Sequence, residues 1–399
     1  MIVSGLDVHK DTIFCAVYNG KTYGEVKEYS TTTGSLRVMG SDLKASGVVK
    51  IAMESTSIYW IPVWNILEES GFELTLVNPY LIKQMPGRKS DVKDAQWIAK
   101  LLHKGMLRAS MVPDERIRML RSYSRKYVKL QRRITSVLQD IERTLEICNI
   151  RITSLVSNIG GKSILEVVRK IVSGENSSKV LLSCIHGRIK NRNGTKVEKA
   201  LEGFISEHHR FNLELLMEEH DLLLSQSQRV ESEMKNICKT HYSEQLDLLQ
   251  SIPGIKILSA MLIIAETGAD MKAFENSSKF VGWTGLRPRN DESAGKYKST
   301  AITKGNGYLR RILVQVAWAA SRTKGSYFKE KFNHLAVRKS SKKALIAIAR
   351  KLSVIIWNVL KYKQEYNPGR MEIYDPVKIQ AKLNYHKMQF ERLEKIIQS

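Results

Sequence analysis

Long apolar runs are missing from this 399-residue sequence. A membrane-spanning helix needs about 18 or more consecutive apolar residues, and stretches such as residues 258–265 are far shorter. The first residues, Met1-Ile-Val-Ser-Gly-Leu-Asp, lead directly into a strand pattern and lack the basic start and apolar core of a secretory signal. We therefore expect no membrane partner and a cytoplasmic location.

Cysteine is scarce as well. The four cysteines stand at positions 15, 148, 184 and 238, and no two of them form a Cys-X-X-Cys pair. This spacing argues against both a disulfide framework and a zinc knuckle. We expect reduced cysteines that fill buried space.

Acidic residues are outnumbered, 40 against 64 lysines and arginines, which gives a formal net charge of +24. Such an excess is typical of proteins that neutralise phosphates, so nucleic acid is the predicted partner. The stretch 279–351 alone holds 18 basic residues and three acidic ones. A generally basic protein or a membrane-surface binder is the alternative, but no basic amphipathic lipid-binding pattern is present.

The length predicts several domains, which we place at residues 1–110, 111–245 and 246–350, followed by a helical tail at 351–399. In the first region three strand patterns (2–8, 12–18 and 23–29) precede alternating helices and strands. This order predicts a mixed α/β sheet of the RNase H-like (RuvC-like) class, although other α/β folds share the pattern.

The remainder of the chain is predicted to be almost entirely helical. Apolar residues recur at helical spacing over 116–150 and again over 213–238, with a smaller helical insert between them. The two stretches could pair as a long antiparallel coiled coil, within one chain or between two. We favour dimerisation, because the apolar stripes exceed what a linker needs.

The third region begins with two helical patterns joined by the turn Pro253-Gly254, which resembles a helix-hairpin-helix. The amides of such a turn can hold a phosphate. A polar, glycine-containing loop and a basic helix over 308–322 follow.

Four carboxylates are placed so that they could meet. Asp7 and Glu54 end two apolar strand patterns, whereas Asp91 and Asp94 stand three residues apart at a helix start and so share one face. Charges at the ends of apolar central strands are costly unless they bind something. Several converging carboxylates are what two-metal phosphoryl transfer requires, so the set predicts a site for Mg²⁺ or Mn²⁺.

Each acid has a simpler interpretation. Asp91 could be a helix N-cap and Asp94 a favourable charge in a first turn. Asp11 could replace Asp7 in the set of metal ligands, but it begins the second strand, where its side chain is less firmly predicted to face the interior. A sugar-kinase fold also begins with a strand that ends in Asp, but Val8-His-Lys-Asp follows here in place of small phosphate-wrapping residues.

Two sets of short motifs stand in the N-terminal and C-terminal parts of the chain. The N-terminal set is Gly5-Leu-Asp-Val-His-Lys, Met53-Glu-Ser-Thr, Val77-Asn-Pro and Lys89-Ser-Asp-Val-Lys-Asp-Ala. The C-terminal set is Ile252-Pro-Gly-Ile, Phe280-Val-Gly-Trp-Thr-Gly-Leu-Arg-Pro, Ser293-Ala-Gly-Lys and Ile302-Thr-Lys-Gly-Asn-Gly-Tyr-Leu-Arg-Arg. Both sets resemble those of the DEDD transposases of the insertion-sequence 110 type, which are bridge-RNA-guided serine recombinases. The resemblance covers nearly the whole chain.

The resemblance implies a composite active site, in which the carboxylates of one protomer meet a nucleophilic serine of another. The motif places that serine at Ser293, and its attack on DNA would leave a 5′-phosphoserine link. The sequence Glu292-Ser-Ala-Gly departs from the family's usual Ser-Gly or Ser-Ser-Gly-Gly, so Ser299 remains a second candidate. Cations near in sequence could stabilise the phosphorane: Lys296, Lys298, Lys304, Arg310 and Arg311.

By resemblance, the protein is also expected to be a homo-oligomer, a dimer or a tetramer in the synaptic complex. It would bind the DNA of element ends and target together with a structured guide RNA, and it would associate with the bacterial nucleoid. The sequence leaves two other functions open. One is a junction nuclease that uses the same carboxylates with water as the nucleophile. The other is a catalytically decayed nucleic-acid-binding protein.

Overall fold

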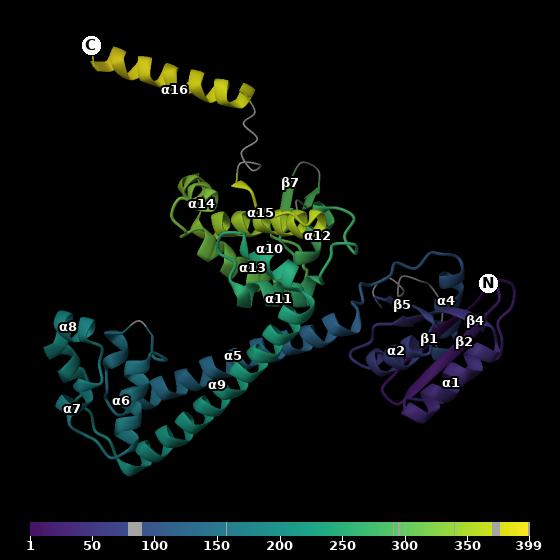
Figure 1. Ribbon diagram of the computed structural model, residues 1–399, viewed down its shortest axis with the longest axis horizontal. Helices are drawn as coiled ribbons and strands as arrows, with labels where there is room; N and C mark the ends of the chain where they lie inside the picture. Colours follow the sequence, from purple (N-terminus) through teal and green to yellow (C-terminus); the bar gives the residue numbers. More distant parts are fainter. Residues whose placement is uncertain are drawn as a thin grey trace. The chain divides into compact units, whose positions relative to one another are not determined.

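The computed structural model describes residues 1–78, 90–156, 158–289, 291–293, 296–299, 301–338, 340–368 and 376–397. For 291–293 and 296–299 it describes the backbone alone. The chain divides into two compact units, Met1–Pro113 and Asp114–Ser399 (Figure 1).

The first unit is built on one five-stranded mixed sheet. Its strands are β1 (Ile2–Val8), β2 (Thr12–Tyr18), β3 (Lys27–Ser30), β4 (Val48–Glu54) and β5 (Glu73–Val77). They lie in the order β3-β2-β1-β4-β5. Strand β2 is antiparallel to both β1 and β3, and β4 and β5 run parallel to β1. This order is that of an RNase H-like domain, so the predicted fold class is confirmed. The third strand begins later than predicted, because Tyr23 forms only an isolated bridge with Tyr18.

Helices cover both faces of this sheet. Helices α1 (Thr33–Ala45) and α2 (Trp60–Glu69) share one apolar core with alternate residues of β1 and β4, among them Leu6 and Met53. Helix α4 (Asp91–His103) covers the opposite face, where Ala52 of β4 packs with Ile98. Because side chains alternate along a strand, Gly5 and Asp7 of β1 lie on the α4 face.

Gly5 explains how closely α4 approaches the sheet. A β-carbon at this position would stand 2.3 Å from the Ala95 carbonyl oxygen and 2.4 Å from the Ala99 nitrogen. No side chain fits in that space, so only glycine lets the helix backbone rest on β1. The close contact places the first turn of α4 beside the end of β1.

Two long helices dominate the second unit, α5 (Glu115–Ile147) and α9 (Glu207–His241). They lie side by side in Figure 1, and Gln131 Nε2 of α5 donates to Ser227 Oγ of α9 over 2.8 Å. The helix pairing predicted from the sequence therefore occurs within one chain. The 3-10 turn Ile152–Ser154 and three shorter helices, α6 (Lys162–Val172), α7 (Ser178–Ser183) and α8 (Gly187–Ala200), lie between the two in sequence and supply residues to their shared core.

The rest of the second unit is mainly helical. Its helices are α10 (Ser243–Gln250), α11 (Ile257–Thr267), α12 (Ser277–Thr284), α13 (Gly307–Ala320), α14 (Tyr327–Arg338), α15 (Ser341–Tyr362) and α16 (Pro376–Ile397). Helix α15 runs across position 350, where we placed the end of the third domain from the sequence. Two short strands, β6 (Asp291–Ser293) and β7 (Lys296–Ser299), form a hairpin where the sequence predicted only a loop.

The turn between α10 and α11 packs against the end of α13. Gly254 has a φ of 90°, and a β-carbon there would stand 2.6 Å from the Ala320 nitrogen at the end of α13. Phosphate binding by this turn remains a prediction.

All four cysteines are free thiols, and three of them are buried while Cys184 is partly exposed. Within the described ranges, no helix is both long and apolar enough to span a membrane.

Candidate active site

Asp7 is a carboxylate held inside the first unit. Its side chain is 9% exposed, on the face of β1 that α4 covers. Leu6 pairs with Met53 of the parallel strand β4. Asp7 and Glu54 are the next residues of these two strands, so they lie at the same edge of the sheet. Glu54 is partly exposed, and its Oε1 accepts a hydrogen bond of 3.1 Å from Thr56 Oγ1. Two strand ends thus bring two acids together.

Helix α4 adds the other two acids from its first turn, Asp91 and Asp94. The N-cap of this helix is Ser90, whose side chain accepts from the Lys93 nitrogen over 3.4 Å. The alternative interpretation of Asp91 as the N-cap is therefore wrong. The partial positive charge at a helix N-terminus favours carboxylates in the first turn, whether or not they bind a cation.

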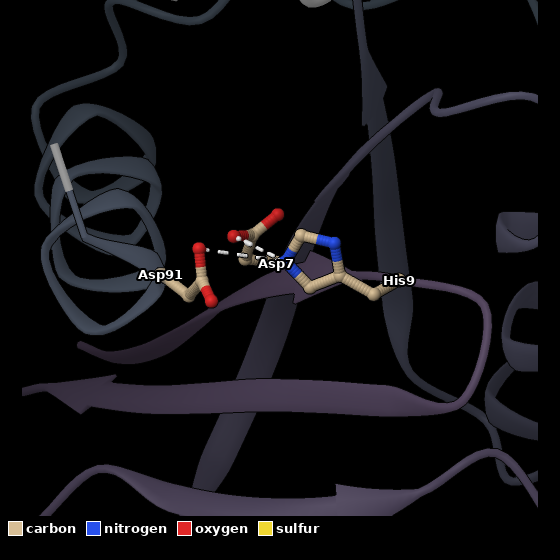
Figure 2. Close-up of side chains that lie close together, drawn as sticks. All are labelled: Asp7, His9 and Asp91. Carbon is tan, nitrogen blue, oxygen red and sulfur yellow. Dashed lines mark hydrogen bonds and ion pairs between the residues drawn. The ribbon is translucent and has the colours of Figure 1, made fainter.

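His9 faces both the strand acid Asp7 and the helix acid Asp91, and the dashed lines of Figure 2 join its ring to each of them. Its Nε2 is 3.2 Å from Asp7 Oδ2 and 3.7 Å from Asp91 Oδ1. One ligand atom from each of the three residues can be chosen so that all lie within 4.8 Å of one another. The sequence analysis did not single out His9, although a residue two positions after Asp7 in extended chain lies on the same face.

The electrostatics of Asp7 agree with this crowding. Burial, together with repulsion from Glu54, Asp91 and Asp94, raises the pKa of its carboxyl from 3.8 to about 6, while His9 opposes the shift. All four predicted acids are therefore near enough to interact. Among the described residues, the group of converging ligand atoms consists of Asp7, His9 and Asp91, so Glu54, Asp94 and the exposed Asp11 stand outside it.

This arrangement fits a divalent cation. Burying a negatively charged carboxylate beside other carboxylates is costly, and a bound cation lowers this cost because it neutralises their charge. Carboxylate oxygens are the ligands of Mg²⁺, Mn²⁺ and Ca²⁺, and an imidazole nitrogen suits transition metals. Asp7, His9 and Asp91 could each offer one ligand atom to such an ion, and Glu54 and Asp94 are further candidates from the sequence.

The predicted nucleophile belongs to the second unit. Ser293 is the last residue of β6, and its backbone pairs with Lys296 of β7, so it stands at the tip of the hairpin. The side chains of Ser293, Lys296, Lys298 and Ser299 lie outside the described part of the chain. Of the other predicted cations, Lys304 and Arg311 are exposed and Arg310 is partly buried.

The base of this hairpin is closed by backbone contacts. The Asn306 nitrogen donates to the Trp283 carbonyl oxygen over 2.8 Å, and the Thr303 nitrogen donates to the Arg287 oxygen over 2.8 Å. Gly285 is left-handed, with a φ of 72°, and a β-carbon on Gly305 would stand 2.4 Å from its nitrogen. The two glycines of the C-terminal motifs therefore let two backbones meet where the hairpin begins and ends.

Two transposase family models match this chain. A model of DEDD transposases of the IS110 type, described as "Transposase", matches residues 4–150, which include all four acids. A second model, described as "Transposase IS116/IS110/IS902 family", matches residues 246–333, which include the hairpin. The chain belongs to the IS110 family of transposases. As a transposase it is an enzyme that acts on DNA.

Relatives of similar length agree with this assignment. The "Transposase for insertion sequence element IS1111A" of Coxiella burnetii is 23% identical over 389 residues, 92% of this chain and 92% of the relative. A protein of Pseudomonas aeruginosa named "Probable family 20 transposase" is 25% identical over 333 residues, 80% of this chain and 86% of the relative.

Among solved structures, RuvC of T. thermophilus in complex with a Holliday junction substrate matches 28% of this transposase and 99% of its own chain. The identity is 13% and the TM-score is 0.22, too low to assign a fold or a function. The RNase H-like assignment rests on the strand order.

Proposed function

We propose that this transposase cleaves and exchanges DNA strands with two groups, the metal-binding carboxylates of the first unit and the hydroxyl of Ser293. Ser293 Oγ attacks a DNA phosphorus and forms a phosphoserine bond to the 5′ side, while the bond from phosphorus to the 3′ oxygen breaks. The leaving 3′ oxygen takes up a proton, and the serine proton passes to a base. A 3′-hydroxyl of another strand then attacks the phosphoserine, which joins the strands and restores the serine.

The single observation that supports the metal-dependent part is the convergence of Asp7, His9 and Asp91, whose ligand atoms lie within 4.8 Å of one another. When bound there, a divalent cation lowers the charge of the phosphate and stabilises the pentacovalent transition state. Thr56 orients Glu54 by donating to one of its two oxygens, so the free oxygen is the one available to a cation.

Motif position and family membership support Ser293 as the nucleophile. Its place at the end of β6 is suited to the role, because a hairpin tip can reach a phosphate that a flat surface cannot. Exposed cations of the same region, Lys304 and Arg311, can stabilise the negative charge of the transition state.

We further propose Mg²⁺ as the working ion, a structured guide RNA as a second partner, and an assembly of two or four copies. The excess of basic residues supports a nucleic-acid partner and does not distinguish RNA from DNA. The guide and the oligomer are inferred from the family resemblance. They predict that the purified protein carries RNA and that carboxylates and serine come from different copies.

Mixed oligomers test the assembly. Copies that lack Ser293 and copies that lack Asp7 should each be inactive alone and should recover activity when mixed. If every mixture stays inactive, the two groups act within one copy.

A strand-transfer assay tests the metal-dependent part of the proposal. The substrate is a plasmid that carries the element's ends and flanking DNA, and the noncoding RNA transcribed beside the gene is supplied. Asp7→Asn and Glu54→Gln should abolish product formation, as should a chelator. Asp11→Asn is the matched control, because Asp11 is an exposed acid near Asp7 in sequence and should keep full activity.

The alternatives give different outcomes in this assay. A junction nuclease would produce hydrolysed ends that depend on Asp7 but never a protein–DNA bond. A decayed protein would bind DNA equally well with and without Asp7→Asn and would produce no product. Strand transfer that survives Asp7→Asn would refute the assigned metal site.

A further inference from the structure

Only two acidic side chains are buried within the described residues, Asp7 and Glu266. Asp7 belongs to the candidate metal site. Glu266, in the last turn of α11, is fully buried and has no part in the chemistry proposed above. Burying a carboxylate costs several kcal/mol unless charged or polar partners compensate, so its partners indicate what the buried charge is for.

The first partner is Arg125 of α5, which binds Glu266 through two hydrogen bonds. Arg125 Nε donates to Oε1 over 3.1 Å and Nη2 donates to Oε2 over 3.2 Å. Arg121, one turn earlier, donates to the backbone oxygens of Ala265 and Glu266 over 3.0 and 2.8 Å. The long helix α5 thus holds both the carboxylate and the end of α11.

The second partner is Asn306, which links Glu266 to the hairpin. Asn306 Nδ2 donates to Glu266 Oε2 over 2.7 Å. The same side chain caps α13, because its Oδ1 accepts from the nitrogens of Tyr308 and Leu309 over 3.0 and 3.1 Å. Its backbone nitrogen donates to Trp283 at the base of the hairpin. Asn306 is therefore fixed on three sides.

Tyr308 adds a further contact between the same elements. The guanidinium carbon of Arg125 lies 4.7 Å from the centre of the Tyr308 ring, a cation–π distance. Arg125 therefore contacts both the buried acid and the first turn of α13. Three elements, α5, α11 and α13, meet at Glu266, and the chain that carries Ser293 begins and ends beside them.

We propose that Glu266 is a positioning residue for the Ser293 hairpin. Through Asn306 it fixes the base of the hairpin to α5, so that the backbone that carries the serine is held in one position. The proposal rests on the proposed role of Ser293 as the nucleophile. A buried carboxylate suits this task, because a hydrogen bond to a charged acceptor is shorter and stronger than one between neutral groups.

Substitutions at Asn306 separate this contact from helix capping. Asn306→Ser keeps a capping hydroxyl for α13 and removes the donor to Glu266. Asn306→Asp also keeps a cap but places a second carboxylate against Glu266. Asn276→Ser is the matched control, because Asn276 caps α12 through the Lys279 nitrogen.

The readout is the rate at which a Ser293-dependent DNA adduct forms at saturating DNA, measured beside DNA affinity. Asn306→Ser and Asn306→Asp should slow the adduct by about tenfold or more, the effect of losing one charged hydrogen bond, with affinity unchanged. Asn276→Ser should keep the native rate. Native rates in both Asn306 variants, or an equal loss in Asn276→Ser, would overturn the proposal.

Hydrogen exchange separates this inference from the proposed function. If the native protein forms no Ser293-dependent adduct, the proposed nucleophile is wrong. The amides of 286–289 and 301–305 still report on the base of the hairpin, since Asn306→Asp should raise their exchange and Asn276→Ser should not. Equal exchange in all variants would show that Glu266 does not fix the hairpin.

Discussion

Gly5 of β1 lies so close to Ala99 of α4 that a β-carbon would stand 2.4 Å from the Ala99 nitrogen. This contact brings Asp91 and Asp94 to the edge of the sheet where Asp7 and Glu54 end. The carboxylate site therefore depends on a residue that has no side chain.

Gly5→Ala should disrupt both the packing and the site. The added methyl must push α4 away from the sheet, which should lower the free energy of unfolding of the first unit by about 1–3 kcal/mol or more. Divalent-cation affinity should fall with it. Urea denaturation and calorimetric titration measure the two effects.

Gly34→Ala is the matched control for this change. Gly34 is in α1, and a β-carbon there would meet no atom within 4 Å. Because alanine favours a helix by up to about 1 kcal/mol over glycine, stability should be unchanged or higher. Native stability in Gly5→Ala would contradict the close approach of α4.

The raised pKa of Asp7 predicts how the metal-free protein responds to pH. The pKa is about 6 in the folded chain, against 3.8 ordinarily, so folding favours the protonated form. This contribution to stability is complete below about pH 4 and is lost as the pH rises through about 6.

Asp7→Asn, which mimics the protonated carboxyl, tests that pH dependence in the presence of a chelator. Relative to the native chain, this variant should gain up to about 3 kcal/mol between pH 4 and pH 7. Asp11→Asn should show no such gain, because Asp11 is exposed. A constant difference between Asp7→Asn and the native chain would mean that the pKa of Asp7 is not raised in the folded chain.

His9 should influence which cation binds. Its Nε2 is 3.2 Å from an Asp7 oxygen, and a nitrogen ligand favours Mn²⁺ over Mg²⁺. His9→Ala should therefore weaken Mn²⁺ binding by about tenfold and weaken Mg²⁺ binding less, as measured by calorimetry. His103→Ala is the control, because His103 ends α4 and packs on Tyr18. An equal effect of both variants would remove His9 from the site.

The loop after Glu54 contains a strained residue. Ser57 has a φ of 50°, a left-handed conformation that costs a residue with a side chain about 1–2 kcal/mol. Ser57→Gly should relieve this strain and, after the entropy cost of glycine, raise the free energy of unfolding by about 0.5–1 kcal/mol. Ser55→Gly, which relieves no positive φ, should lower it. Thermal denaturation of both variants decides whether the strain is real.

The sequence was sufficient to predict the mixed sheet and that Asp7 and Glu54 lie near the ends of two neighbouring strands. Asp7 and Glu54 end runs of apolar residues, and that pattern marks the ends of buried strands. The helix start at Asp91 could be read from a polar pair three residues apart. The N-cap could not be assigned from composition alone, because Ser90 and Asp91 are both good capping residues.

Contacts between distant segments were beyond the sequence. Glu266 reads as one residue of an apolar helix, and its partner Arg125 lies 141 positions away, so no local pattern connects them. The hairpin β6–β7 is equally hidden, because its strands hold only three and four residues and no alternating apolar pattern marks them.

The most direct test of the account is a search for a covalent bond between the protein and DNA. The native protein is incubated with Mg²⁺, element-end DNA and the noncoding RNA, then denatured, and the DNA-linked peptide is identified by mass spectrometry. We predict a phosphoserine at Ser293 that is absent from Ser293→Ala and from Asp7→Asn but present in Asp11→Asn. An adduct that persists in Ser293→Ala, or cleaved DNA with no adduct, would contradict the account.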